Sequence, residues 1–232
     1  MSGSVVVIGG SSGLGKAVAA HYAAQGREVV VTSRDEARAE AAAEEIGGST
    51  TGIAVDISRP AEIAPALAGL GPVQYLVIAA IERDENSIRD YAVDRAANLA
   101  TLKLVGYPEV IHALLDRFTD DASVVLFGGL AKDRPYPGST MVSTVNGGIS
   151  TLINTLALEL APLRFNAIHP AVVGDTPYWL AKPAEVLEGI RSRTPTGRLV
   201  TTEDIVHATA FLLENRGVNA INLVVDGGSL LK

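Results

Sequence analysis

Cysteine is absent from this sequence of 232 residues. The chain therefore forms no disulfide and has no thiolate to serve as a nucleophile or metal ligand, and cysteine usage leaves its compartment open. Aromatic residues make up only 5% and charged residues 19% of the chain, whereas hydrophobic residues make up 47%. This composition is too apolar for a disordered chain and is typical of a globular protein with a buried core.

Long hydrophobic runs and an excess of positive charge are also missing. No stretch approaches the ~18–20 apolar residues that span a bilayer, and the first residues lack the pattern of a signal peptide. The formal net charge is −7, so most of the surface repels polyphosphate and nucleic acid is not an expected partner. We expect a cytoplasmic protein without membrane association, with residues 1–232 forming a single domain.

Short apolar runs rich in Val and Ile alternate with longer segments of helical character. The runs are continuously apolar, which is typical of strands buried on both faces of a parallel sheet. The predicted strands are residues 5–8, 28–32, 52–55, 73–79, 123–127, 165–168 and 221–225. The predicted helices include residues 14–25, 36–46, 61–70, 98–118 and 141–160. This alternation predicts an α/β fold of the Rossmann type, a doubly wound parallel sheet of about seven strands with helices on both faces.

The least regular segment is residues 170–200, in which prolines recur between two well-defined elements. A lobe that covers a bound substrate has this character, and so has an ordinary long surface loop. Both interpretations stay open at this point.

A glycine-rich segment follows the first predicted strand and opens the first predicted helix. It reads Gly9-Gly10-Ser11-Ser12-Gly13-Leu14-Gly15. Glycines here permit a tight turn and let the backbone approach a pyrophosphate, which then lies at the N-terminus of the helix. The position between a first strand and a first helix makes the pattern specific, and it predicts a dinucleotide site. A glycine-rich turn without a ligand is the alternative.

The end of the second predicted strand indicates which dinucleotide is bound. Arg34 lies about twenty residues beyond the glycines, where an Arg accommodates the 2′-phosphate of NADP and an acidic residue would bind the ribose of NAD. Asp35 follows it, and a solvent-exposed Arg34 at a helix start is the alternative. We expect NADP(H) in preference to NAD(H). Asp56, at the end of the third strand, is placed to meet the adenine or to cap the next segment.

With three further motifs, these features resemble the short-chain dehydrogenase/reductase family over essentially the whole chain. The motifs are Val55-Asp56-Ile57, Leu158-Glu159-Leu160-Ala161-Pro162 leading into Arg164-Phe165-Asn166-Ala167-Ile168-His169-Pro170, and Val225-Asp226-Gly227-Gly228. The resemblance implies the Rossmann-type fold and assembly as a homodimer or homotetramer. The cofactor contacts that it implies, together with the glycine pattern, are Gly9, Ser11, Ser12, Gly13, Leu14, Gly15, Ser33, Arg34, Asp56, Ile57, Ala79, Ala80, Asn146, Pro170, Val172 and Thr176.

The resemblance does not extend to the catalytic residues of the family. Its members carry a Ser after the fifth strand, which polarises the substrate carbonyl, and a Tyr and a Lys four residues apart on the next helix. The Tyr transfers the proton, and the Lys lowers the pKa of that Tyr and binds the nicotinamide ribose. Counting back from Glu159, these positions fall on Gly129, Val142 and Asn146. Glycine has no hydroxyl, valine no proton to transfer and asparagine no charge.

Three residues are candidates to replace the missing groups. Asn98 matches the active-site Asn of the family, although a capping Asn is the alternative. His169 ends the sixth strand and is the histidine best placed to act as a general base near neutral pH, unless it is a buried core histidine. Tyr136 lies on the loop after the fifth strand, where it could supply a proton or pack on the neighbouring prolines. No spacing of His, Asp or Glu suggests a metal site.

Three functions therefore remain open. The chain is a divergent oxidoreductase that binds NADP(H) and a small-molecule substrate and uses substitute catalytic residues, or a non-redox enzyme such as an isomerase, dehydratase or cyclase. The third possibility is a catalytically inactive nucleotide-binding or partner subunit. Loss of general acid catalysis slows a reaction by ~10²–10⁴-fold without forbidding it, so the missing residues do not decide among the three.

Overall fold

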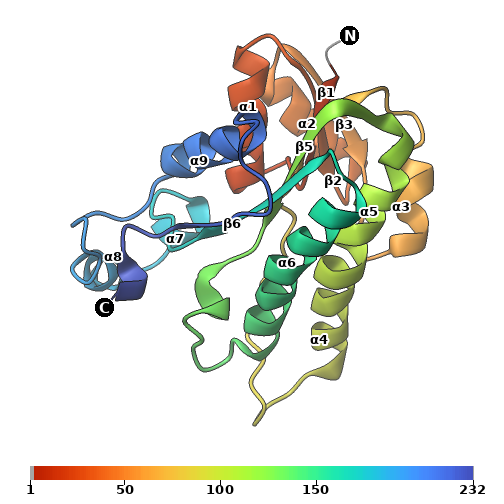
Figure 1. The fold of residues 1–232 in the computed structure, drawn as a ribbon. Helices are drawn as coiled ribbons and strands as arrows, with labels where there is room; N and C mark the ends of the chain where they lie inside the picture. The colour runs from red at the N-terminus through yellow and green to blue at the C-terminus, as the bar shows by residue number, and fades with distance from the viewer. Residues whose placement is uncertain (1–2, 232) are drawn as a thin grey trace.

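Seven parallel strands form one sheet at the centre of the structure, a computed structural model that describes residues 3–231 (Figure 1). The strands are β1 (Ser4–Ile8), β2 (Glu28–Ser33), β3 (Ser49–Ala54), β4 (Val73–Ile78), β5 (Phe118–Phe127), β6 (Arg164–Pro170) and β7 (Asn222–Val225). Their order is β3-β2-β1-β4-β5-β6-β7, and each neighbouring pair is parallel. The chain changes direction across the sheet between β3 and β4, so the predicted doubly wound Rossmann-type fold is confirmed.

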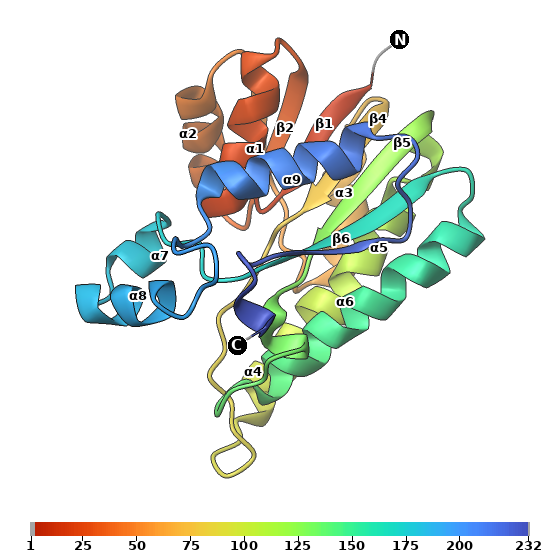
Figure 2. The ribbon, with the colours of Figure 1, turned by 60° about the vertical axis from the view of Figure 1, so that its left-hand side comes forward.

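Helices cover both faces of the sheet (Figures 1 and 2). Those that pack on one face are α1 (Gly13–Ala24), α2 (Glu36–Ile46) and α9 (Thr202–Glu214). Those on the other face are α3 (Pro60–Leu67), α5 (Tyr107–Ala113) and α6 (Thr140–Glu159). A further helix, α4 (Val93–Ala100), runs into α5 through the π-helical segment Thr101–Gly106. None of the helices within residues 3–231 is long and apolar enough to cross a membrane.

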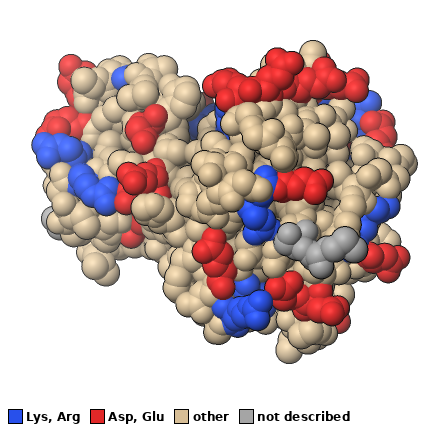
Figure 3. All heavy atoms as spheres, turned by 90° about the horizontal axis from the view of Figure 1, so that it is seen from above, with Lys and Arg blue, Asp and Glu red and all other residues tan. Residues whose placement is uncertain are grey.

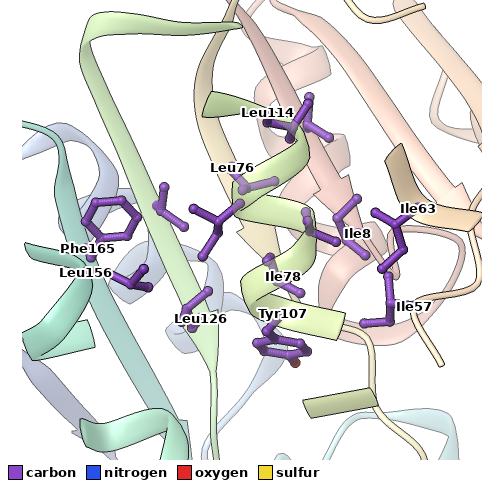
Figure 4. Close-up of a cluster of buried hydrophobic side chains, with 14 of the residues drawn as sticks. Ile8, Ile57, Ile63, Leu76, Ile78, Tyr107, Leu114, Leu126, Leu156 and Phe165 are labelled. Carbon is purple, nitrogen blue, oxygen red and sulfur yellow. The ribbon is translucent and has the colours of Figure 1, made fainter. Parts of the chain in front are cut away.

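The core consists of two apolar clusters, one on each face of the sheet. Along β1, Val6 and Ile8 belong to one cluster and Val5 and Val7 to the other. Side chains alternate between the faces of a strand, so a strand buried on both faces must be apolar at every position. Figure 4 shows the cluster on the side of α3, α5 and α6, with Tyr107 beside the aliphatic side chains. Each such fully buried aliphatic side chain stabilises the fold by about 1.5–3 kcal/mol.

Two boundaries differ from the prediction. The predicted helix over residues 98–118 begins earlier, at Val93, and the chain enters β5 at Phe118, where that helix was expected to end. The first half of β5 contains the exposed residues Asp120 and Asp121, so it lacks the apolar run that marks strands such as β1 and β4. Its only strand partner in β4 there is Val73, which pairs with Phe118 before the register shifts.

The irregular segment after β6 folds into two short helices, α7 (Pro177–Leu180) and α8 (Ala184–Arg191). In Figure 2 these helices lie beyond the carboxyl end of the sheet, apart from the helices that cover its faces. The chain then returns to the sheet through α9, which begins with a capping box between Thr201 and Asp204.

Candidate functional site

A cavity of about 960 Å³ opens at the carboxyl ends of the strands. Residues at or just after the ends of five strands line it: Ile8, Ser33, Ala79, Phe127 and Pro170. Doubly wound proteins bind ligands at this edge, where the strand order reverses, and the volume is near the upper end of the usual range for ligand sites, about 300–1,000 Å³. All the residues expected to contact the cofactor, from Gly9 to Thr176, line this one cavity.

The glycine loop has a backbone that other residues would not adopt. Gly9 has φ +80°, and a Cβ built on Gly15 would lie 2.3 Å from the carbonyl oxygen of Gly9. The N–H of Gly9 donates to Thr32 Oγ1 at 3.1 Å, which ties the loop to β2. In the described part of the chain the side chain of Ser12, at the N-cap of α1, bonds to no helix N–H. The first N–H groups of α1 therefore receive no capping bond from Ser12. These groups face the cavity, and they are the donors that a bound pyrophosphate needs.

The adenosine end of the cavity is cationic. Arg34 and Arg38 both line it, and within residues 3–231 neither guanidinium has an ion-pair partner. The carboxylate of Asp35 is used elsewhere, because its Oδ1 accepts a hydrogen bond from the N–H of Arg38 at 2.8 Å and caps α2. This is the acidic residue that argued against NADP in the sequence, and it contributes nothing to the cavity lining.

Asp56 caps its own turn and also lies on the cavity lining. Its Oδ1 accepts hydrogen bonds from the N–H of Ser58 at 3.0 Å and from Ser58 Oγ at 2.6 Å, so it caps the turn after β3. It also lines the cavity beside Ile57.

The positions that carry Ser, Tyr and Lys in the resembling family meet at the cavity. Gly129, Val142 and Asn146 all line it, and a Cβ built on Gly129 would lie 2.8 Å from Asn146 Nδ2. The backbone therefore brings these three positions to one cavity, as expected for the catalytic side chains. The Ser hydroxyl is replaced by the hydrogen of Gly129, the Tyr phenol by the isopropyl group of Val142 and the Lys ammonium by the amide of Asn146.

The structure places His169 as a buried core histidine, the alternative that the sequence leaves open, and not at the cavity where a general base would act. The ring is fully buried and does not line the cavity. The N–H of Gly129 donates to Nδ1 at 3.1 Å, and Nε2 lies 2.9 Å from Asn222 Oδ1. Asn222 Nδ2 donates to the carbonyl of Ser150, so its Oδ1 faces the ring and His169 holds its proton on Nε2. Burial lowers the pKa of His169, so the ring stays neutral. Both ring nitrogens are already used in hydrogen bonds within the protein.

Asn98 is not at the cavity either. Its Nδ2 donates to Glu82 Oε2 at 2.5 Å, and the side chain does not line the site. The helix that carries it continues through the π-helical segment Thr101–Gly106, which changes the face that its residues present. Leu102 and Lys103 reach the cavity from this helix instead.

Tyr136 does line the cavity, on the loop before α6, with 54% of its surface exposed. Ser139 Oγ holds the backbone of this residue, accepting from its N–H at 2.9 Å and donating to its carbonyl at 2.7 Å. Partial burial raises the pKa of Tyr136 above its usual value, so its hydroxyl keeps its proton at neutral pH.

Several cavity residues could not be identified from the sequence, among them Arg38, Tyr178, Trp179, Arg193 and, most unusual in its surroundings, Lys103. Lys103 is 1% exposed, yet it lines the cavity. Its Nζ donates to the carbonyl oxygen of Phe127 at 2.5 Å and lies 4.8 Å from the ring centroid of Tyr107. Burial lowers the pKa of this ammonium to about 7. The feature of the sequence that could have indicated this residue is a lysine inside an apolar run, Leu102-Lys103-Leu104-Val105, four residues before Tyr107.

The segment after β6, the lobe of residues 170–200, also lines the cavity. Tyr178 and Trp179 from α7 line it, as do Ile190 and Arg193 from the end of the lobe. The guanidinium carbon of Arg83, on the loop after β4, lies 3.3 Å from the ring centroid of Tyr178. This stacking joins the lobe to the loop after β4.

A Tyr-x-x-x-Lys spacing is present in this lobe. Tyr178 and Lys182 are four residues apart, but Lys182 is exposed and its Nζ lies 4.6 Å from the ring centroid of Tyr178. The ammonium thus stacks on the ring face, and the pair does not reproduce the arrangement of the family on α6.

The cavity has the opposite charge from the chain as a whole. Its cationic lining residues are Arg34, Arg38, Arg83, Lys103, Arg134 and Arg193. The acidic ones, Asp56 and Asp226, already accept hydrogen bonds from their own turns. On the molecular face in Figure 3, acidic side chains form the larger charged groups. A cationic cavity in an acidic protein favours an anionic ligand. Within residues 3–231 no group of three or more carboxylate or imidazole side chains is arranged to hold a metal ion.

Comparison with known proteins agrees with this geometry. A family model described as enoyl-(acyl carrier protein) reductase matches residues 8–229. A solved structure described as a short chain dehydrogenase/reductase family protein superposes with a TM-score of 0.88 at 28% identity, covering 99% of this chain and 97% of the other. The chain belongs to the short-chain dehydrogenase/reductase family.

Its similarity to named reductases extends over nearly the full length. The 3-oxoacyl-[acyl-carrier-protein] reductase of Homo sapiens is 30% identical over 231 residues, which covers 96% of this chain and 95% of that protein. Carbonyl reductase family member 4 of Xenopus laevis is 30% identical over 237 residues, covering 98% of each. The relatives of this short-chain dehydrogenase/reductase therefore include reductases without added or missing domains.

Proposed function

We propose that this short-chain dehydrogenase/reductase is an NADPH-dependent reductase of a carbonyl group on a small, anionic molecule. The observation that carries the proposal is the single cavity in which a glycine loop at a helix N-terminus meets two unpaired guanidiniums, Arg34 and Arg38. The names of its relatives, 3-oxoacyl and carbonyl reductases, support the choice of a carbonyl substrate.

The residues present fit the cofactor along its length. The glycine loop and the N-terminus of α1 would hold the pyrophosphate, and Arg34 with Arg38 would hold the 2′-phosphate. Asp56 and Ile57 would border the adenine, and Asn146, Pro170, Val172 and Thr176 would border the nicotinamide. When bound, NADPH supplies a hydride to the substrate carbonyl.

The rest of the cavity is suited to hold an anionic carbonyl compound. Tyr178, Trp179 and Ile190 present apolar surface that excludes water from the reacting carbonyl. Arg83, Arg134 and Arg193 lie on the same lining and would bind a carboxylate or phosphate of the substrate. These contacts orient the substrate by its charged end, which leaves the carbonyl toward Gly129, Val142 and Asn146.

Cofactor titration tests the first half of the proposal. Calorimetric titration should give at least tenfold tighter binding of NADPH than of NADH, because charge-assisted hydrogen bonds contribute roughly 1.5–3 kcal/mol each. Arg34→Met should remove most of that difference by weakening NADPH binding alone. Arg89→Met is the matched control, because Arg89 is exposed and outside the cavity lining. Absence of binding of either cofactor at millimolar concentration would overturn the proposal, as would an unchanged preference in Arg34→Met.

Measurements of turnover test the second half of the proposal, the reduction of an anionic carbonyl compound. NADPH oxidation should be measured with 3-oxoacyl thioesters and with ketones that do and do not carry a carboxylate. The expected result is oxidation that favours the anionic ketones, with the preference reduced in Arg193→Met. A protein that binds NADPH but never oxidises it across this panel would instead be a non-redox enzyme or an inactive nucleotide-binding subunit.

A further inference from the structure

We propose that Lys103 is the catalytic acid of this site, donating to the substrate the proton that the absent Tyr would have supplied. The inference rests on the proposed reductase function and adds to it the identity of the proton donor. Lys103 reaches the cavity from the helix that begins as α4, whereas the family places its Tyr on α6, at the position of Val142.

The hydrogen bonds of Lys103 leave it able to donate. A charged lysine has three N–H bonds, and within residues 3–231 the carbonyl oxygen of Phe127 is its one hydrogen-bond acceptor, at 2.5 Å. Lys103 lines the cavity, and its remaining N–H bonds have no acceptor among the described residues. Phe127 ends β5 two residues before Gly129, and Gly129 lies against Asn146. The ammonium is thereby bonded to the strand end that leads into the loop of Gly129, and it shares the cavity with Gly129, Val142 and Asn146.

The surroundings of Lys103 destabilise the folded protein, which is unusual for a residue with a purely structural role. Within the described residues it forms no ion pair with a carboxylate, and it is buried beside the ring of Tyr107. A buried ammonium without a counter-ion destabilises a fold, and such perturbed groups concentrate at functional sites. Tyr107 already joins this helix to the sheet, because its hydroxyl donates to the carbonyl of Ala80 at 2.8 Å. Lys103 is therefore not required for that attachment.

The proposed step balances in atoms and electrons. The carbonyl carbon receives a hydride, which carries two electrons and comes from NADPH, and the π pair of the carbonyl moves to its oxygen. The developing alkoxide takes a proton from Nζ of Lys103, which becomes a neutral amine. The amine regains a proton from water at the open side of the cavity. An acid with a pKa of about 7 is close to the optimum for proton transfer at neutral pH.

Tyr136 is the competing donor and is less suited to the task. It lies on the exposed rim, its hydroxyl has a pKa above the usual value, and a loop carries it. Lys103 is fixed on a helix and by its bond to the end of β5. Tyr136→Phe should therefore reduce the rate far less than substitution of Lys103.

The kinetic test compares Lys103→Met with Lys132→Met, which removes a lysine outside the cavity lining. Lys103→Met should lower kcat by ~10²–10⁴-fold, with NADPH affinity within a few-fold of the wild type. Wild-type kcat should fall as the pH rises above about 7, since only the ammonium donates, and Lys103→Met should lose this dependence. Lys103→Arg keeps the charge and the fold but does not deprotonate, so it should be slow as well.

A second measurement does not depend on turnover. In protein labelled with ¹³C at the lysine ε-carbon, NMR should show one lysine that titrates near pH 7, absent from Lys103→Met and shifted when NADP⁺ is added. Titration of every lysine near 10, or full activity of Lys103→Met, overturns the inference and leaves the reductase function standing. A lysine that titrates near 7 in a protein that never oxidises NADPH overturns both the proposed function and the role of Lys103 in it.

Discussion

The N–H of Gly129 donates to Nδ1 of His169 across 3.1 Å, so a buried imidazole fixes the loop at the position of the missing catalytic Ser. The opposite nitrogen of the ring bonds to Asn222 at the start of β7. His169 thus connects the loop after β5, strand β6 and strand β7 below the floor of the cavity. A histidine that appears in the sequence as a possible base is a structural link between these elements.

Replacing His169 should reduce stability without removing the cofactor site. His169→Leu leaves the N–H of Gly129 and Oδ1 of Asn222 without a partner, and unsatisfied buried groups cost about 1–3 kcal/mol each. Urea denaturation should show a loss of that order, while NADPH affinity of the folded variant stays within a few-fold of the wild type. A variant as stable as the wild type but inactive would return His169 to the list of catalytic candidates.

The same histidine should make stability depend on pH. Burial lowers its pKa below the usual 6.5, so as the pH falls through 6.5 the unfolded chain takes up a proton before the folded protein does. The contribution of neutral His169 to stability is therefore present above pH 6.5 and is lost as the pH falls below it. Free energies of unfolding measured at pH 5.5 and 7.5 should fall less with acidification in His169→Leu than in the wild type. An equal fall in both proteins would contradict the assignment.

Gly15→Ala should disrupt the cofactor site by sterics alone. The added Cβ would lie 2.3 Å from the carbonyl oxygen of Gly9, so the loop or the first turn of α1 must move. We expect NADPH binding to weaken by at least tenfold and stability to fall by about 1–3 kcal/mol, measured by titration and by thermal unfolding. Gly69→Ala is the control, because its Cβ would meet no atom within 4 Å. Equal effects in the two variants would count against a cradle built on Gly15.

The fold could be predicted because its signals are local and repeated. Strand β1 is buried on both faces and is therefore apolar at almost every position, and the glycine loop lies directly after it. The residues expected at the cofactor site all reach the cavity because their positions depend on strand ends, which the fold determines. The irregular segment after β6 could be located by its prolines, but the contact between Arg83 and Tyr178 could not be foreseen.

The catalytic candidates depended on details that the sequence does not carry. Asn98 matched the motif by position, but the π-helical segment that follows brings Lys103 to the cavity. The role of His169 depends on Asn222, more than fifty residues away in the chain, which occupies one of its ring nitrogens. Both outcomes follow from how the elements pack, which residue types and their spacing alone do not determine.

The stacking of Arg83 on Tyr178 should hold the lobe of residues 170–200 in place. Cation–π contacts of this kind contribute about 0.5–2 kcal/mol, so Arg83→Ala should raise amide hydrogen exchange in residues 177–191 without changing exchange in the sheet. Arg89→Ala is a control for loss of a surface charge, because Arg89 is exposed and lies outside the cavity lining. Unchanged exchange in the lobe would show that other contacts hold it.

Introducing the Ser, Tyr and Lys of the family should give the protein a second donor for the proton that the substrate takes up. Gly129→Ser alone places a Cβ 2.8 Å from Asn146 Nδ2, so Ser fits only when Asn146 moves or is replaced. The triple variant Gly129→Ser, Val142→Tyr, Asn146→Lys should therefore reduce carbonyl compounds even when Lys103→Met is added, whereas Lys103→Met by itself should be nearly inactive. NADPH oxidation by these variants and the wild type, each checked for cofactor binding, measures the rescue. If the combined variant folds and binds NADPH but stays inactive, Lys103 does more than supply a proton, because a Tyr in its usual place cannot substitute for it.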